Sequence, residues 1–334
     1  MIAILRIGFC ATDLGRAATP HPGRDPNPEG APSLSRRSLA RQGGVFDLVI
    51  ILSVILLFTS CTHQPRIVVG CKNFTEQIIL GELIAQQIEN RTHLAVERRF
   101  YLGGTYIAHQ SILAGRIDIY PEYTGTALTA VLKQSPASDP KAVYDRVKSE
   151  YESHFHLTLG PPLGFNDTFA IEVRGDDARR LHLQTLSQAA AYTPQWRAGF
   201  GYEFMERPDG YKGLVAIYGL RFAAPPRIMD LGLLTRALKD RQVDLIAGNM
   251  TDGLIPALDL FVLEDDKHYF PPYEAVPVIR EQTLAEHPEL KEAIDSLAGN
   301  ISDAEMRQLN YAVDGQKRDV KEVVRNFLIS KGLL

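Results

Sequence analysis

Cysteine is scarce in this 334-residue sequence, and the three residues present, Cys10, Cys61 and Cys71, all lie in the N-terminal quarter. None forms a C-x-x-C pair or a cluster with histidine, which argues against a zinc site and against a disulfide framework. An excess of charge of one sign is also missing, because 36 basic residues face 40 acidic ones and leave a net charge of -4. No long basic run follows residue 41, so we expect no nucleic-acid partner.

Motifs of catalysis and of nucleotide binding are absent as well. The chain has no G-x-S-x-G elbow, no H-E-x-x-H, no Walker A sequence and no G-x-G-x-x-G that opens a helix. No nucleophile can be paired with a base from the sequence. We therefore expect neither an enzyme nor a cofactor, and we expect no bound metal ion.

The composition is that of a globular protein that can bury sizeable cores, with 45% hydrophobic and 23% charged residues. The length suggests two domains in addition to a targeting segment. Residues 1–44 are rich in Pro, Gly, Ser and Arg and show no sustained apolar period, so they predict a leader rather than part of a fold.

An apolar run over residues 45–58 follows Arg36, Arg37 and Arg41 and precedes Thr59-Ser-Cys61. A charged region, an apolar region and a small residue in this order are typical of an export signal, and the run is too short to span a bilayer comfortably. The cysteine after Phe-Thr-Ser resembles a bacterial lipobox, in which the signal is cut before the Cys and the thiol is acylated. A plain secretory signal or an uncleaved anchor, with Cys61 incidental, is the alternative. We assign residues 1–61 to a leader and lipoprotein-type signal, which places the rest outside the cytoplasm at the membrane surface.

The exported part alternates between short β-branched runs and amphipathic stretches. Successive strand–helix units of this kind predict an α/β fold with ligand sites at the carboxyl ends of the strands. Strands are expected at 66–70, 94–101, 117–120, 165–173, 215–217, 227–229, 243–247 and 276–280. Helices are expected at 75–88, 106–114, 125–134, 141–153, 231–240 and through most of 281–334, where Ser302-Asp-Ala-Glu305 forms a capping box.

The last helix, over 320–329, has a core-facing period and is assigned to the first lobe, so the chain crosses to a second lobe and returns. We expect lobe 1 to comprise 66–165 plus 272–334, and lobe 2 to comprise 166–271, with 263–273 as a polar, proline-rich return. Two crossings predict a two-segment hinge with a ligand cleft between the lobes.

Aromatic side chains stand beside turn residues at four of the expected junctions. The segments are Lys72-Asn-Phe-Thr75, Tyr120-Pro-Glu-Tyr-Thr-Gly-Thr126, Asn166-Asp-Thr-Phe169 and Pro271-Pro-Tyr273. Aromatic faces attract a quaternary ammonium group with about 0.5–2 kcal/mol per ring when water is excluded. Because such a group donates no hydrogen bond, an aromatic box suits it better than carboxylates alone. Ordinary packing of these rings is the alternative.

Several strings resemble the motifs of the osmoprotectant substrate-binding proteins, which are the glycine betaine/choline/carnitine-binding components of ABC importers. They are Gly70-Cys-Lys-Asn-Phe-Thr-Glu-Gln77, Gly104-Thr105, Asp118-Ile-Tyr-Pro-Glu-Tyr-Thr-Gly-Thr126, Glu203-Phe204 with Arg207-x-Asp-Gly210, Thr251-Asp-Gly253 and Phe270-Pro-Pro-Tyr273. The resemblance runs from about residue 66 to the C-terminus. It implies a two-lobed periplasmic-binding-protein fold of type II, which closes on the ligand, and it implies a permease and its ATPase as partners.

The resemblance also implies roles for individual residues. Tyr123 and Tyr273 match tyrosines of a cage around a trimethylammonium head, and Phe169 stands at a third cage position. Lys72, Thr126 and Arg207 match residues that hold a ligand carboxylate, for which a planar guanidinium fork is well suited. Two alternatives are a surface ammonium for Lys72 and a structural salt bridge to Asp209 or Glu203 for Arg207.

Asn249 departs from the pattern, because family members often carry a cage tyrosine where this chain reads Gly248-Asn-Met-Thr-Asp-Gly253. Losing one cation–π face costs roughly 2- to 30-fold in affinity if nothing replaces it. We expect a monomer that binds glycine betaine, choline or carnitine. The alternatives are another zwitterion, such as an ergothioneine-like compound or an amino acid, and a periplasmic enzyme or ligand-sensing module on the same scaffold.

Overall fold

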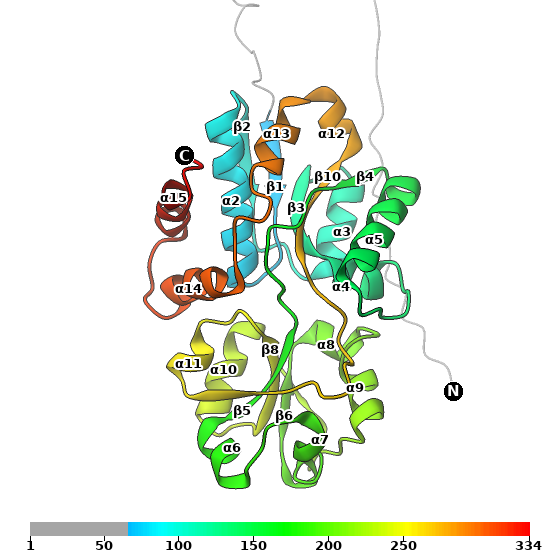
Figure 1. Ribbon diagram of the computed structural model, residues 1–334, viewed down its shortest axis with the longest axis vertical. Coiled ribbons are helices and arrows are strands. Elements are labelled where there is room, and N and C mark those ends of the chain that lie inside the picture. The colour runs from blue at the N-terminus through cyan, green and yellow to red at the C-terminus, as the bar shows by residue number, and fades with distance from the viewer. Residues whose placement is uncertain (1–65) are drawn as a thin grey trace, which may run out of the picture. The chain divides into compact units, whose positions relative to one another are not determined.

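The computed structural model describes residues 66–334, and the expected export signal with Cys61 lies outside that range. The described strands form two five-stranded sheets (Figure 1). The first has the order β2-β1-β3-β10-β4, from β1 (Arg66–Gly70), β2 (Ala95–Arg99), β3 (Ile119–Tyr123), β4 (Leu157–Leu159) and β10 (Ala275–Arg280). The second has the order β7-β6-β8-β5-β9, from β5 (Phe169–Arg174), β6 (Ala198–Phe200), β7 (Arg227–Ile228), β8 (Leu245–Asn249) and β9 (Leu260–Leu263). We call each sheet with its helices a lobe.

Strand direction in the first lobe follows from the connections. Strand β1 is parallel to β2 and to β3, because a helix lies between each pair of consecutive strands. Strand β10 returns from the second lobe and is antiparallel to β3 and β4, with Ala275 opposite Tyr123. The second lobe is also mixed, with β6 parallel to β7 and β8, and with β5 antiparallel to β8 and β9. Phe169, the first residue of β5, lies opposite Asn249, the last residue of β8.

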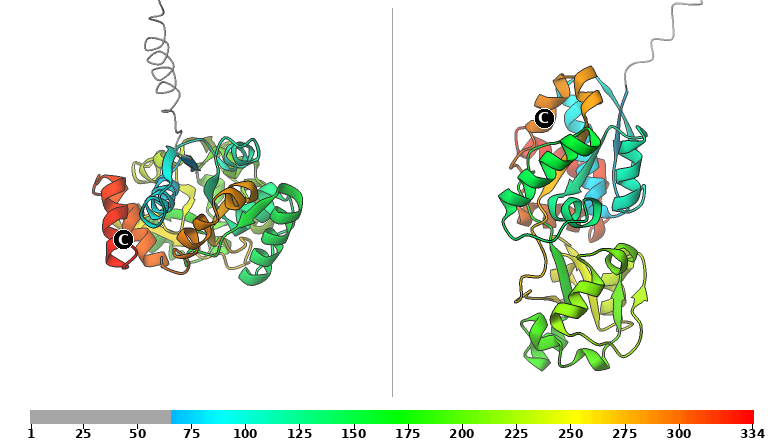
Figure 2. Two further views of the ribbon diagram at one scale, coloured as in Figure 1. Left: turned by 90° about the horizontal axis from the view of Figure 1, so that it is seen from above. Right: turned by 90° about the vertical axis from the view of Figure 1, so that its right-hand side faces the viewer.

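The helices of the first lobe cover both faces of its sheet. They are α2 (Thr75–Arg91), α3 (Thr105–Leu113), α4 (Thr124–Thr126), the π-helical turn η1 (Ala127–Val131), α5 (Pro140–Phe155), α12 (Glu281–Glu286), α13 (Glu289–Asp295), α14 (Asp303–Asp314) and α15 (Val320–Ser330). One core joins the sheet to α2, α13, α14 and α15, and another joins its opposite face to α3, η1 and α5. Helices α13, α14 and α15 contact α2 although they end the chain, as Figures 1 and 2 show.

The second lobe carries shorter helices. They are α6 (Gly175–Leu181), α7 (Leu186–Ala189), the 3-10 turn η2 (Thr193–Gln195), α8 (Tyr202–Glu206), α9 (Tyr211–Tyr218), α10 (Leu231–Lys239) and α11 (Leu254–Ala257). Its sheet also has a core on each face: alternate β5 residues Ile171 and Val173 pack on one side, and Ile246 of β8 packs under α10 on the other. This alternation is the pleat of a sheet that is buried on both faces.

Two segments cross between the lobes, the first around Asn166 and the second around Glu274, and they run side by side. Asn166 forms an antiparallel bridge with Glu274. The Tyr273 amide donates a hydrogen bond to the Asn166 side-chain oxygen (2.6 Å), and the Asp167 amide donates one to the Tyr273 carbonyl (3.0 Å). The predicted two-segment hinge of a two-lobed α/β fold is thus present, while the predicted residue limits of the lobes stay a prediction.

Local sequence signals account for most of the elements, with clear exceptions. The capping box at Ser302 begins α14, and Asp139 caps α5, in which Pro140 is the first residue. The strand expected at 215–217 is wrong, because these residues lie inside α9, where Leu214 and Tyr218 are the buried residues, one helical turn apart. A short apolar run has no period that separates strand from helix. The helix expected over 125–134 is shorter and partly π-helical, and strands β4, β6 and β9 were not expected.

Candidate functional site

A cavity of about 380 Å³ is lined by residues of both lobes and of the first crossing segment. Every predicted ligand-binding residue lines it, namely Lys72, Tyr123, Thr126, Phe169, Arg207, Asn249 and Tyr273. They come from the segment after β1, from the junction of β3 with α4, from the start of β5, from the residue after α8, from the end of β8 and from the crossing segment just before β10. The size suits a small organic ligand.

Aromatic rings form part of the cavity wall, among them the predicted cage residues Tyr123, Phe169 and Tyr273. Phe169 lies edge-on to Tyr273, with ring centroids 5.6 Å apart and planes at 78°. Tyr123 is stacked beside Phe74 at 6.5 Å and 18°. A side chain at Gly125 would lie 2.6 Å from the Pro272 carbonyl oxygen, so the glycine allows the two tyrosine-bearing segments to approach closely.

Both cage tyrosines use their hydroxyl groups within the protein. The Tyr123 hydroxyl donates to Glu76 Oε1 (2.7 Å), and the Tyr273 hydroxyl donates to Asp209 Oδ2 (2.6 Å). Burial raises the pKa of each phenol well above its usual value, so both rings are neutral. The hydroxyls anchor the rings, and the aromatic face is the part that a ligand can use.

Arg207 already has an ionic partner. Its Nε donates to Asp209 Oδ1 (2.9 Å), its Nη2 donates to Oδ2, and both residues are buried. Burial by itself raises the pKa of Asp209, but the hydrogen bonds and charge of Arg207 hold that pKa below its ordinary value. The guanidinium carbon lies 5.0 Å from the Phe169 centroid and 5.8 Å from that of Tyr273. Arg207 therefore forms the salt bridge to Asp209 that the sequence left as an alternative.

Lys72 is buried rather than a surface ammonium. It forms an ion pair with Glu122, and its Nζ lies 5.2 Å from the Tyr123 centroid. Two threonines of the cavity wall, by contrast, have hydroxyl groups that make no hydrogen bond within residues 66–334. Thr105 Oγ1 is buried without a hydrogen bond, and the Thr126 side chain, 2% exposed, makes none. These hydroxyls can bind polar atoms of a ligand.

Sequence reasoning missed a group of polar residues behind the cage. Asp167, which lines the cavity, accepts hydrogen bonds from Asn249 Nδ2 (2.8 Å) and from the Thr251 amide (3.2 Å). The Thr251 hydroxyl lies 2.8 Å from Asp167 Oδ1 and also contacts Glu76 Oε2. Asp167 and Thr251 stand in strings that the sequence singled out, but neither string indicates that the two meet.

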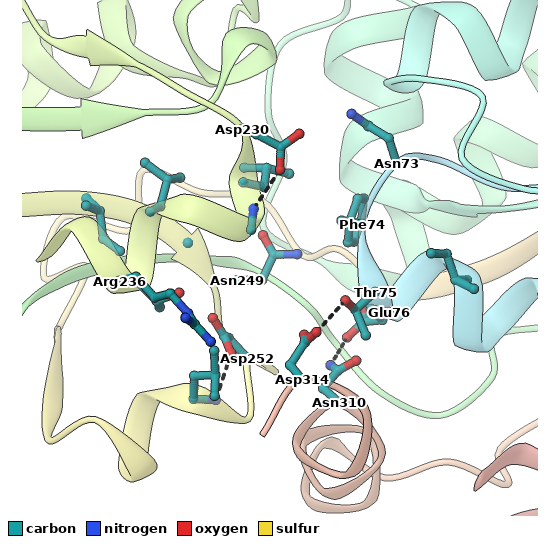
Figure 3. A pocket seen from close by; sticks show the side chains of 18 of the residues that line it. Asn73, Phe74, Thr75, Glu76, Asp230, Arg236, Asn249, Asp252, Asn310 and Asp314 are labelled. Carbon is teal, nitrogen blue, oxygen red and sulfur yellow. Dashed lines mark hydrogen bonds between the residues drawn. The ribbon is translucent and has the colours of Figure 1, made fainter. Parts of the chain in front are cut away.

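A second cavity of about 200 Å³ adjoins the first. Asn73, Phe74, Asp230, Leu231 and Asn249 line both cavities and so separate them. Figure 3 shows this second space, with Asn249 facing the start of α2 and with Asp252, Asn310 and Asp314 around its other side. Asn249 thus stands between a ring-lined space and a polar one.

Within the described range, no three His, Cys, Asp or Glu side chains are arranged to hold a metal ion. The helices of residues 66–334 include none with the length and apolar character needed to cross a membrane.

Two α/β lobes, joined by paired crossing segments beside a ring-lined cavity, define a two-lobed solute-binding protein. Residues 65–330 match the family described as the substrate binding domain of ABC-type glycine betaine transport systems, and the chain belongs to that family. The motif resemblance, the two-lobed α/β fold and the assignment as a substrate-binding protein of an ABC importer are thereby confirmed. Members of this class bind a small ligand outside the cytoplasm and work with a permease; they are transport proteins rather than enzymes.

Individual relatives agree with this assignment. The carnitine transport binding protein OpuCC of Listeria monocytogenes is 36% identical over 291 residues, which cover 84% of this chain and 94% of that protein. The ergothioneine transport permease/ergothioneine binding protein EgtU of Helicobacter pylori is 32% identical over 307 residues, 91% of this chain and 55% of that protein. A crystal structure of a glycine betaine/carnitine/choline ABC transporter protein has a TM-score of 0.67 and 35% identity over 80% of this chain and 99% of that one.

Proposed function

We propose that the chain is a lipid-anchored, monomeric solute receptor that captures a quaternary-ammonium compound, such as glycine betaine, choline or carnitine, and delivers it to its permease. The observation that carries the proposal is the convergence of Tyr123, Phe169 and Tyr273 on one cavity. These rings come from three segments far apart in the chain. Because the tyrosine hydroxyls are bound to Glu76 and Asp209, the rings offer their aromatic faces, which suit a cation that donates no hydrogen bond.

Polar groups at the same cavity suit the other end of such a ligand. Arg207 uses Nε and Nη2 for Asp209, and within residues 66–334 its Nη1 makes no hydrogen bond. A ligand carboxylate can therefore approach the free edge of the guanidinium while the salt bridge persists. The unpartnered hydroxyls of Thr105 and Thr126 add donors. The Lys72 ammonium group is ion-paired with Glu122. We therefore expect Lys72 to act on a ligand through its positive charge and through its contact with the Tyr123 ring, and not by a direct hydrogen bond.

Asn249 favours ligands that carry a hydrogen-bond donor. Its Nδ2 is bound to Asp167, and no hydrogen bond to its Oδ1 is formed among the described residues. The free oxygen can accept from the hydroxyl of choline or carnitine, or from the ring N–H of an ergothioneine-like compound, whereas glycine betaine has no donor to offer.

The Cys61 anchor rests on the sequence signal alone. Residues 58–61 place a cysteine directly after the apolar run and two small residues. Acylation of this thiol would hold the binding lobes at the outer face of the membrane, near the permease. Mass spectrometry of the protein from its native membrane, compared with Cys61→Ser, tests for the lipid.

Isothermal titration of the full-length protein, kept in solution by a non-ionic detergent, tests the ligand. Glycine betaine, choline, carnitine, ergothioneine and the standard amino acids are titrated separately. We expect micromolar binding of at least one trimethylated compound that carries a donor, weaker binding of glycine betaine, and no binding of common amino acids. Binding of an amino acid with silence from every trimethylated compound would leave the family assignment intact and overturn the cage.

A further inference from the structure

Two buried carboxyl groups meet on a single hydroxyl behind the cage. Thr251 Oγ1 lies 2.8 Å from Asp167 Oδ1 and closer still to Glu76 Oε2. A hydroxyl has one proton to donate, so it cannot satisfy two ionised carboxylates at the same time. It can donate to one carboxylate while it accepts from the O–H of the other. The geometry therefore requires at least one proton on the Asp167–Glu76 pair: the pair carries one negative charge when Asp167 is ionised and none when both carboxyl groups are protonated.

No cation of residues 66–334 forms a salt bridge with either carboxyl group. The other partners of Glu76 are the Tyr123 hydroxyl and Asn310 Nδ2 (2.9 Å), and those of Asp167 are Asn249 Nδ2 and a backbone amide. Figure 3 shows the Glu76–Asn310 contact at the edge of the second cavity.

The two buried cations of the cavity wall already have acidic partners, because Lys72 pairs with Glu122 and Arg207 pairs with Asp209. The described cavity wall thus has two balanced ion pairs and, when Asp167 is ionised, one carboxylate without a cationic partner. Burying an unpaired charge is costly, and a ligand cation in the cavity would offset that cost.

Resting on the proposed function, we infer that Asp167 supplies the counter-charge for the quaternary ammonium head, and that Glu76 holds the shared proton through Thr251 while the ligand is bound. Asp167 is the member of the pair that lines the cavity, and it lies two residues before Phe169. The rings then provide the walls, and Asp167 provides the charge that distinguishes a cationic head from a neutral group of the same shape.

The same contacts connect the two lobes. Glu76 is on α2 and Asn310 is on α14, both in the first lobe, whereas Thr251 follows β8 in the second lobe and Asp167 is on the first crossing segment. Burial raises the pKa of both carboxyl groups, and their mutual repulsion raises that of Asp167 further. Ionisation of the pair, ligand charge and the contact between lobes are therefore linked.

Other titratable or charged groups around the pair come from every neighbouring element. They are Tyr123 on β3, Asp252 after β8, Asp303 and Asp314 on α14, Arg307, which donates to the Met250 carbonyl, and Lys72 over the Tyr123 ring. The acidic residues in this set oppose ionisation of the pair. A bound cation favours it, so binding releases protons and strengthens as the pH rises.

Tetramethylammonium is the sharpest probe, because it has a permanent charge and no carboxylate. Its affinity for the wild-type full-length protein, measured by titration calorimetry from pH 5 to 7, should rise with pH. Buffers of different ionisation enthalpy should reveal proton release. Asp167→Asn should bind it at least about tenfold more weakly, as expected for one lost charge contact at an effective dielectric constant of about 20, and should lose the pH dependence. Asp145→Asn, which removes an exposed acid of α5 far from the pair in the fold, should retain both.

The outcomes separate the two proposals. Equal affinity and equal proton release in wild type and Asp167→Asn would overturn the counter-charge and leave the aromatic cage standing. If the wild type binds no quaternary ammonium compound at all, the proposed function fails and the counter-charge fails with it.

A ligand-free measurement adds an independent check. In carbon-13 carboxyl spectra of the unliganded protein, a signal in addition to those of Asp252 and Glu172 should titrate well above the ordinary range, and it should disappear or shift in both Asp167→Asn and Glu76→Gln. Absence of this additional signal would overturn the shared proton.

Discussion

Tyr123, Tyr273 and Arg207 each have one part of the side chain held by the protein and another part left for the cavity. Tyr123 and Tyr273 give their hydroxyls to Glu76 and Asp209, and Arg207 gives one edge of its guanidinium group to Asp209. What remains are ring faces and one guanidinium edge. Such fixed side chains lose little conformational entropy when a ligand binds, which favours affinity.

Substitutions at Tyr123 separate the ring from the hydroxyl. Tyr123→Ala should weaken a quaternary-ammonium ligand by roughly tenfold or more, because a desolvated ring face is lost. Tyr123→Phe should keep affinity within about threefold. It should cost about 1 kcal/mol of folding stability, because Glu76 loses a hydrogen-bond donor. Titration calorimetry and urea unfolding measure the two effects. Equal affinity losses in both variants would show that the hydroxyl, and not the ring, carries the binding.

At the scale of elements, the junctions between strands and helices position the site. The β3–α4 junction carries Tyr123 and Thr126, the start of β5 carries Phe169, and the crossing segment just before β10 carries Tyr273. Helix α14 supports the site from behind, since Asn310 contacts both Glu76 and the Thr251 carbonyl. The position of Asn310 depends on the residue at which α14 begins, and the capping box at Ser302 fixes that residue.

Removal of this cap should destabilise the helix without touching the cavity. In Ser302→Ala the Glu305 amide loses its side-chain acceptor, and the expected cost is about 1 kcal/mol. Urea unfolding measures the change. Ser138→Ala, at an exposed loop serine that makes no hydrogen bond within residues 66–334, is the matched control and should be neutral. Equal stability of the two variants would mean that the box contributes nothing to α14.

At the scale of the whole molecule, buried acids make stability depend on pH. Burial raises the pKa of Asp252 to about 6, and it raises the pKa of Glu172 well above its usual value. An acid whose pKa is higher in the folded state binds more protons there than in the unfolded chain. Its favourable contribution is complete below the unfolded pKa of about 4 and is lost as the pH rises through the folded value.

Asp252→Asn isolates one such contribution. In the wild type the Leu254 amide donates a hydrogen bond to Asp252 Oδ1 (2.8 Å). Asparagine keeps an oxygen that can accept this hydrogen bond, but it cannot ionise. Relative to wild type, the variant should therefore gain stability between pH 4 and pH 7, with most of the change complete near pH 6. Urea unfolding at several pH values tests this, with Asp145→Asn at an exposed position of α5 as control. A difference between variant and wild type that stays constant with pH would contradict the raised pKa.

Much of this protein was determined by its sequence, because the relevant signals are local. The alternation of strand and helix, the capping box and the string Tyr120–Thr126 each involve neighbouring residues, and they led to the fold and the family. Part of the cavity lining could also be anticipated, since Tyr123 stands at the carboxyl end of β3, where ligands of α/β sheets bind.

Only the tertiary structure decided how the polar groups pair. Glu76 and Thr251 are 175 residues apart, and Tyr273 and Asp209 are 64 apart, so no local pattern indicates that they touch. The short run at 215–217 likewise became helix because α9 buries Leu214 and Tyr218 on one face. Burial and partner choice arise when both lobes are packed around their crossing segments. These two properties set the charge of the site, and the sequence alone supplied only its residues.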